Sequence, residues 1–68
     1  MTLTFGKQLD MHLSTLDYRG AAYTVKAAGL IDHGSVLEHS PTHLVVVDQN
    51  ILHFINLDTV TLVTVEEL

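Results

Sequence analysis

Residues 43–65, HLVVVDQNILHFINLDTVTLVTV, contain the strongest indications of secondary structure in the chain. Its three runs of apolar and β-branched residues are typical of strands. They are separated by DQN at residues 48–50 and by LDT at residues 57–59. The first separator suits a short hairpin connection, because Asp and Asn tolerate turn conformations, and the second suits a single 3₁₀ turn. We therefore predict three consecutive strands, over residues 43–48, 51–56 and 60–65.

The residues before this stretch begin with the pattern of an amphipathic helix. Apolar side chains recur there at spacings of four, four and three, which places them on one helix face: Phe5, Leu9, Leu13 and Leu16. Thr4 is a suitable N-cap, and Gly20 stands just past the end, where glycine commonly terminates a helix. We predict a helix over residues 4–17.

Between this helix and the apolar stretch, the sequence predicts two more strands. Alternating and β-branched residues favour strands over residues 21–28 and 30–38, and Pro41 predicts a turn after them. Gly34 lies inside the second of these strands, where glycine permits strong bending or the close approach of another strand. We predict a mainly β fold of one domain over residues 1–68. We expect this fold to be a small five-stranded, strongly bent antiparallel β-barrel of the SH3-like kind with an N-terminal α-helix.

Size and composition restrict how such a domain becomes stable. A chain of 68 residues buries only about 60% of its unfolded surface and usually needs disulfides, metals or oligomerisation. The chain has no cysteine, so disulfides are excluded and oligomerisation is the expected aid. With 47% hydrophobic residues, the chain is not expected to be disordered.

Charge and hydropathy bear on partners and location. Eight acidic and three basic residues give a formal charge of −5 with neutral histidines, which leaves little of the basic surface that nucleic-acid binders carry. Five histidines make this charge sensitive to pH. No apolar run is long enough to span a bilayer, and no basic segment precedes an apolar one as in a signal peptide. We expect a cytoplasmic protein that does not enter a membrane.

The order of elements and several scaffold positions resemble the Sm/LSm family, and within it the bacterial Hfq proteins. The resemblance covers residues 4–65. Positions of the first family motif are matched by Gly34, Val36, Val45 and Val47, and positions of the second by Leu52, Leu57 and Val60. The spacing from Gly29 to Gly34 and the segment NLDTV at residues 56–60 are also similar to Hfq. The resemblance implies an Sm-like ring from a bacterium or one of its viruses, with an RNA-binding or RNA-chaperone role.

The sequence departs from the family at the positions that the resemblance assigns to RNA. His39-Ser40 stands in place of an aromatic-Asp pair, His43 begins the pair that replaces hydrophobic-Asn, and His53-Phe54 replaces Arg-Gly. The resemblance places these residues at a central pore. The candidate nucleic-acid-binding residues are therefore His39, Ser40, His43, His53 and Phe54, with Phe54 as a base-stacking platform. The opposing interpretation is that the histidines are solvated loop residues and Phe54 is packed; the low positive charge favours it.

Metal binding and catalysis have less support. His39 and His43 have the i, i+4 spacing of helical zinc ligands, but Pro41 between them argues against a helix. The serines lack the glycine elbow or lysine partner of nucleophilic enzymes. We expect no enzymatic activity, no cofactor and no bound metal. A metal- or small-ligand-binding barrel is the third functional hypothesis.

Ring assembly is what the resemblance implies for the apolar strand edges. Sm-family subunits pair strand four of one subunit with strand five of the next, and such a heterologous contact must close into a ring or grow into a fibre. We predict a cyclic homo-oligomer, roughly a pentamer to heptamer. The expected interface residues are Leu52, Val60, Leu62, Val63 and Val65. The two leading functional hypotheses are a ring that binds single-stranded RNA weakly and a structural or protein-interaction ring without RNA binding.

Overall fold

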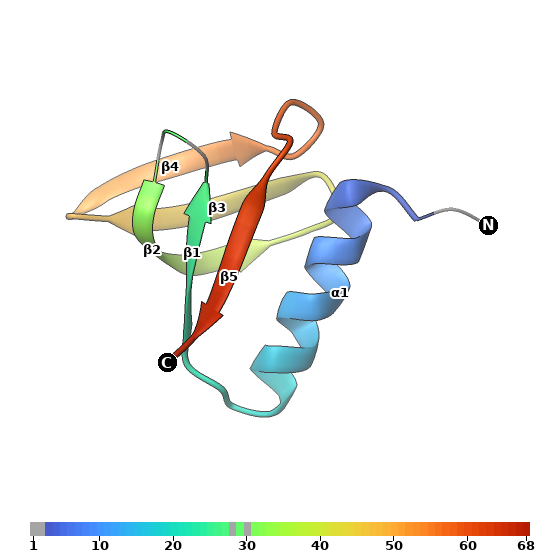
Figure 1. The fold of residues 1–68 in the computed structure, drawn as a ribbon, viewed down its shortest axis with the longest axis horizontal. Helices are drawn as coiled ribbons and strands as arrows, with labels where there is room; N and C mark the ends of the chain where they lie inside the picture. The colour runs from blue at the N-terminus through green and yellow to red at the C-terminus, as the bar shows by residue number, and fades with distance from the viewer. Residues whose placement is uncertain (1–2, 28, 30) are drawn as a thin grey trace.

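The computed structural model of this chain describes residues 3–27, 29 and 31–68. One helix precedes five strands: α1 (Phe5–Tyr18), β1 (Tyr23–Ala27), β2 (Ile31–His39), β3 (His43–Asp48), β4 (Ile51–Asn56) and β5 (Val63–Glu67). The strands form one antiparallel sheet in the order β4-β3-β2-β1-β5, with α1 beside it (Figure 1). The predicted mainly β fold with an N-terminal helix is therefore confirmed. No helix in the described part of the chain is long and apolar enough to cross a membrane.

The predicted element bounds agree best in the middle of the chain. The strands predicted over residues 43–48 and 51–56 coincide with β3 and β4, whereas α1 and β2 end one residue later than predicted. β1 begins two residues later than predicted, and β5 begins three residues later. The predicted 3₁₀ turn is a single turn in which Thr59 N donates to Asn56 O at 3.2 Å. The predicted strand ends at Ala28 and Leu30, and the first two residues of the predicted domain, lie outside the described residues.

The prediction of a barrel is wrong for the single chain, because the sheet stays open. Among the described residues, β4 pairs with β3 alone and β5 pairs with β1 alone, so the sheet has two edges. Residues 57–62 carry the chain from one edge of the sheet to the other instead of folding β5 back onto β4 (Figure 1). Helix α1 contributes Leu13 and Leu16 to the core, so the helix rather than strand closure completes it.

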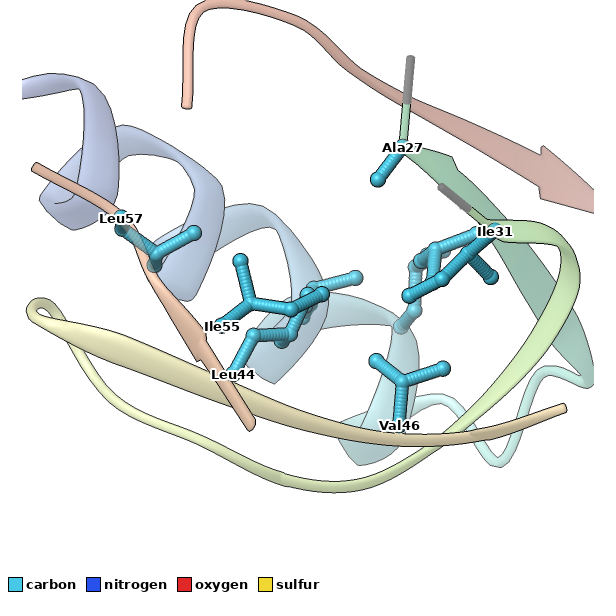
Figure 2. Close-up of a cluster of buried hydrophobic side chains, with 9 residues drawn as sticks. Ala27, Ile31, Leu44, Val46, Ile55 and Leu57 are labelled. Atoms are coloured by element: carbon cyan, nitrogen blue, oxygen red, sulfur yellow. The ribbon is translucent and has the colours of Figure 1, made fainter. Parts of the chain in front are cut away.

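The hydrophobic core lies between α1 and one side of the curved sheet. Its buried side chains are Leu13, Leu16, Val25, Ala27, Ile31, Leu44, Val46, Ile55 and Leu57. In Figure 2, Leu44, Val46 and Ile55 point into one cluster beside the helix. Phe5, which the sequence pattern placed on the packed helix face, is 39% exposed, because α1 packs mainly through Leu13 and Leu16.

Strands β3 and β4 have two distinct sides, which we call inner and outer. Directly opposite residues of antiparallel strands project to the same side of a sheet. The pairs Leu44–Ile55 and Val46–His53 therefore face inward, toward the core. The pairs Val45–Phe54 and Val47–Leu52 face outward. Both sides of β3 are apolar, but only the inner side is fully buried by this chain.

Gly34 explains how β2 bends around the core. The register of β2 shifts against both neighbouring strands, as at β-bulges, and bulges increase bending. A Cβ atom on Gly34 would lie 2.2 Å from Val46 Cγ1 and 2.8 Å from Ile31 Cγ2. Any side chain at this position would therefore overlap the core. The bending predicted at this glycine agrees with these register shifts, while the close neighbours of Gly34 are core side chains rather than the backbone of another strand.

Helix α1 is fixed at its ends and against the sheet. Thr4 Oγ1 accepts a hydrogen bond from Lys7 N at 3.1 Å, which confirms the predicted N-cap. Gly20 has φ of 68°, the left-handed conformation that commonly ends helices. A Cβ on Gly6 would lie 1.9 Å from Pro41 O, so the first helical turn packs directly on the turn between β2 and β3.

Candidate functional site

The turn between β2 and β3 is organised by the Ser40 hydroxyl. Ser40 Oγ accepts from the backbone N–H groups of Thr42 and His43, both at 3.2 Å, and lies 2.9 Å from His43 Nδ1. On the other side of the imidazole, Nε2 lies 3.2 Å from Glu38 Oε1. Ser40 and His43, two of the candidate residues, are thus in direct contact. Both ring nitrogens of His43 are engaged by groups of this chain.

His39 is directed away from that turn and toward α1. Its Nδ1 lies 2.5 Å from Asp10 Oδ1 and its Nε2 lies 2.8 Å from Asp17 Oδ2. A histidine that donates from both ring nitrogens is the charged imidazolium. The Tyr23 hydroxyl donates to the other Asp17 oxygen at 2.9 Å. This group of four residues, the His39 clamp, ties the end of β2 to the helix and to β1.

The clamp changes the proton affinities of its members. Burial alone would lower the pKa of His39, but hydrogen bonds and charges from Asp17 and Asp10 outweigh burial and raise it. Hydrogen bonds from His39 and Tyr23 lower the pKa of Asp17. Burial and the neighbouring Asp17 carboxylate raise the pKa of Tyr23 to about 12. The clamp therefore favours a charged histidine between two carboxylates, which is a structural tie rather than a surface for phosphate.

The His39 clamp does not have the arrangement of a metal centre. Each ring nitrogen faces a different carboxylate, so the ligand atoms do not converge on one point. In the residues that the structure describes, no group of three or more His, Asp or Glu could hold a metal ion.

On β4, His53 and Phe54 project to opposite sides of the sheet. His53 faces inward opposite Val46 and is half-buried, whereas Phe54 faces outward opposite Val45 and is 77% exposed. An aromatic ring of this exposure is available for stacking. Of the five residues predicted to bind nucleic acid, His43 and Phe54 share a site, and Ser40 supports His43. His39 and His53 face the inner side.

The shared site is an open groove at the end of the β3–β4 hairpin. It has a volume of about 440 Å³ and is lined by Thr42, His43, Leu44, Phe54, Ile55, Asn56 and Asp58. Asn56 Oδ1 accepts from Asp58 N at 2.9 Å, which orders the start of the segment after β4. Asn56 and Asp58 were not among the site residues predicted from the sequence. Their signal is the Asn-x-Asp spacing of a side-chain-to-backbone turn, which places both polar groups beside Phe54.

The predicted interface residues fall into two groups. Leu52 and Leu62 are 53% and 56% exposed, as a contact surface requires. The side chains of the other three are half-buried against the core of their own chain: Val60, Val63 and Val65. For these three, an interface would use mainly backbone groups.

Comparisons with known proteins leave the family open. Neither protein-family models, nor curated proteins, nor solved structures give a significant match to this chain. The Sm/LSm resemblance therefore remains a prediction, carried by the sequence positions and by the order of elements.

Proposed function

We propose that this chain is the repeating unit of a ring formed by pairing β4 of one subunit with β5 of the next. The observation that carries the proposal is the strand order, which places β4 and β5 at the two edges of one open sheet. An unpaired edge presents N–H and C=O groups that template pairing with another chain. Because the two edges differ, pairing between them is heterologous, and such a contact either closes into a ring or grows into a fibre; closure leaves no edge unpaired.

The backbone groups available at each edge follow from the hydrogen-bond pattern. A two-residue connection joins Asp48 to Ile51, so that pair closes the hairpin and exchanges hydrogen bonds. Hydrogen-bonded and non-hydrogen-bonded pairs then alternate, which directs the N–H and C=O of Leu52 and Phe54 away from β3. On β5, Leu68 N donates to Ala22 O, and the same alternation directs the groups of Val63 and Val65 outward. Both edges offer such groups over a similar length.

Exposed apolar side chains beside these edges add to the proposal. Ile51 and Leu52 on β4 are 58% and 53% exposed, and Leu62, just before β5, is 56% exposed. Burying such side chains on association is favourable, at roughly 25 cal/mol per Å² of apolar surface. A short domain with large exposed apolar side chains on its edges gains more from assembly than a larger one.

A substitution at the β4 edge tests the ring. Leu52→Pro removes one N–H that is directed outward, while the ladder to β3 does not use that N–H. Leu52→Ala is the matched control, because it removes the same side chain and keeps the N–H. We expect the unmodified chain and Leu52→Ala to run as one closed species of roughly five to seven subunits. Leu52→Pro should be a folded monomer by native mass spectrometry and circular dichroism. A fully assembled Leu52→Pro ring, or a monomeric unmodified chain, would contradict the proposal.

The second candidate function is a ring that binds single-stranded RNA, as the Sm/LSm resemblance implies. Its support is the exposed Phe54 ring in a groove next to His43, since base stacking on aromatic rings needs no particular sequence. Two observations count against it: the charge of −5, and the engagement of both His43 nitrogens within the chain. Micromolar binding of uridine-rich or adenine-rich RNA that weakens with salt and is lost in Phe54→Ala would favour it.

A further inference from the structure

The groove at the end of the β3–β4 hairpin combines an exposed aromatic ring with carboxylates. Phe54 is 77% exposed, and Asp58 lies in the same lining. A third contributor is Glu38, whose Oε1 lies 3.2 Å from the Nε2 of His43 in that lining. Among the described residues, no Lys or Arg lines the groove. Its volume of about 440 Å³ lies within the range of roughly 300–1,000 Å³ typical of ligand pockets.

The carboxylates give the groove a negative charge, and the ion pairs elsewhere on the chain do little to offset it. Arg19 pairs with Glu67 at 3.0 Å, and Lys26 pairs with Asp32 at 3.7 Å, both away from the groove lining. Two of the three basic residues are thus already matched by carboxylates, in a chain of charge −5. A phosphodiester backbone would approach such a surface against its field, whereas a cationic segment would be attracted.

The geometry points to the side-chain chemistry of arginine. A guanidinium group is planar, stacks on an aromatic face and forms paired hydrogen bonds with a carboxylate. Phe54 supplies the face and Asp58 supplies the carboxylate, while Asn56 is held beside them by its bond to Asp58 N. Lysine carries the same charge but lacks the plane and the paired donors, so it fits less well.

We propose that this groove binds an arginine side chain of a basic segment on a partner protein. The inference goes beyond ring formation and does not require it, because every lining residue belongs to one chain. If the proposed ring forms, the groove is repeated around it, and a segment with several arginines binds more tightly through multivalency.

The test measures binding of fluorescent peptides to the full chain. The probes are an Arg-Gly repeat peptide, a Lys-Gly peptide of equal charge and length, and labelled uridine-rich RNA. We expect binding of the arginine peptide, weaker binding of the lysine peptide and none of the RNA. Asp58→Asn, which keeps the backbone bond to Asn56, and Phe54→Ala should each weaken arginine-peptide binding about tenfold or more.

A matched control distinguishes binding in the groove from nonspecific attraction to the negative charge of the chain. Asp32→Asn also removes one negative charge, but its side chain is 78% exposed and lies outside the groove lining. We expect this variant to bind the arginine peptide as the unmodified chain does. Equal weakening by Asp32→Asn and Asp58→Asn, absence of peptide binding, or RNA binding lost in Phe54→Ala would each overturn the proposal. Binding of one peptide per chain by monomeric Leu52→Pro would support the groove even if no ring forms.

Discussion

The inner and outer sides of the β3–β4 hairpin carry similar apolar residues but differ in how far those residues are exposed to solvent. On the inner side, Leu44 and Val46 are both 0% exposed and pack with Ile55 and α1. On the outer side, Leu52 and Phe54 are 53% and 77% exposed. The hydrophobic effect is roughly proportional to the apolar area removed from water. Within this chain, the inner side therefore contributes more free energy of folding than the outer side.

This difference separates the apolar residues that stabilise the fold from those that we propose for association. The inner side is covered by the helix of the same chain, and its buried polar atoms have partners among the described residues. On the outer side Val45 and Val47 are half-buried, Leu52 and Phe54 are exposed, and this side ends in the groove with Asp58 and Asn56. Exposed apolar surface next to an unpaired strand edge is a feature of interaction sites.

Truncating one leucine on each side tests whether the inner and outer sides differ in burial. Leu44→Ala empties part of a fully buried site and should lower the free energy of unfolding by about 2–5 kcal/mol. Leu52→Ala removes an exposed side chain and should change the stability of the subunit by no more than about 0.5 kcal/mol. Urea denaturation at a protein concentration at which the subunits are monomeric measures both, because association would otherwise add to the apparent stability. Similar losses for the two variants would mean that both sides are buried.

Much of this architecture could be predicted from the sequence, since apolar spacing reports local structure. The continuous apolar run that includes Leu44 and the turn residues from Asp48 onward predicted β3 and β4 with the observed bounds. The barrel was not correctly predicted, because closure depends on where residues 57–62 lead the chain rather than on any local pattern. Val60 is β-branched and was predicted to lie in a strand, but it packs on the core from the segment between β4 and β5.

The candidate site was predictable only in part, for a related reason. Phe54 and His43 were singled out by their place in a resemblance and do line one groove. The His39 clamp joins residues 22 and 29 positions apart, so its formation depends on how α1 packs on the sheet. No spacing along the chain distinguishes a histidine held by a helix from one on a solvated turn.

A change of pH also distinguishes the two regions, because His39 lies on the inner side in the clamp and His43 lies at the groove. The folded-state pKa of His39 is raised above 6.5, so its stabilisation is present below about pH 6.5 and lost as pH rises through the folded value. The pKa of Asp17 is lowered from 3.8, so its contribution is present above that value and lost on acidification. The clamp should therefore stabilise most between about pH 4 and 6.5.

Replacing each histidine tests this window. His39→Asn should lower stability at pH 6 by about 1 kcal/mol, since the clamp is partly exposed and screened. It should also remove the loss of stability that we expect of the unmodified chain between pH 6 and pH 8. His43→Asn is the control and should keep that loss. Denaturation midpoints across pH measure the effect, and an unchanged pH dependence in His39→Asn would show that the clamp does not form in solution.

The smallest change in stability is expected for substitutions in the turn between β3 and β4. This turn helps to set which residues of β4 face inward. Gln49 and Asn50 have φ of 53° and 65°, the two left-handed residues of a type I′ hairpin turn. A slip of one residue in the pairing of β3 with β4 would exchange the inner and outer sets of β4. Replacing Gln49-Asn50 by Asn-Gly, which tolerates these angles best, should stabilise the chain by about 0.5 kcal/mol. In a domain of this size that corresponds to a rise in Tm of about 2–4 °C. Asn50→Val should lower Tm instead, because a β-branched residue is strained at positive φ. The opposite order of these variants in thermal unfolding would mean that the pairing, and with it the distinction between the two sides, is set by core packing and not by the turn.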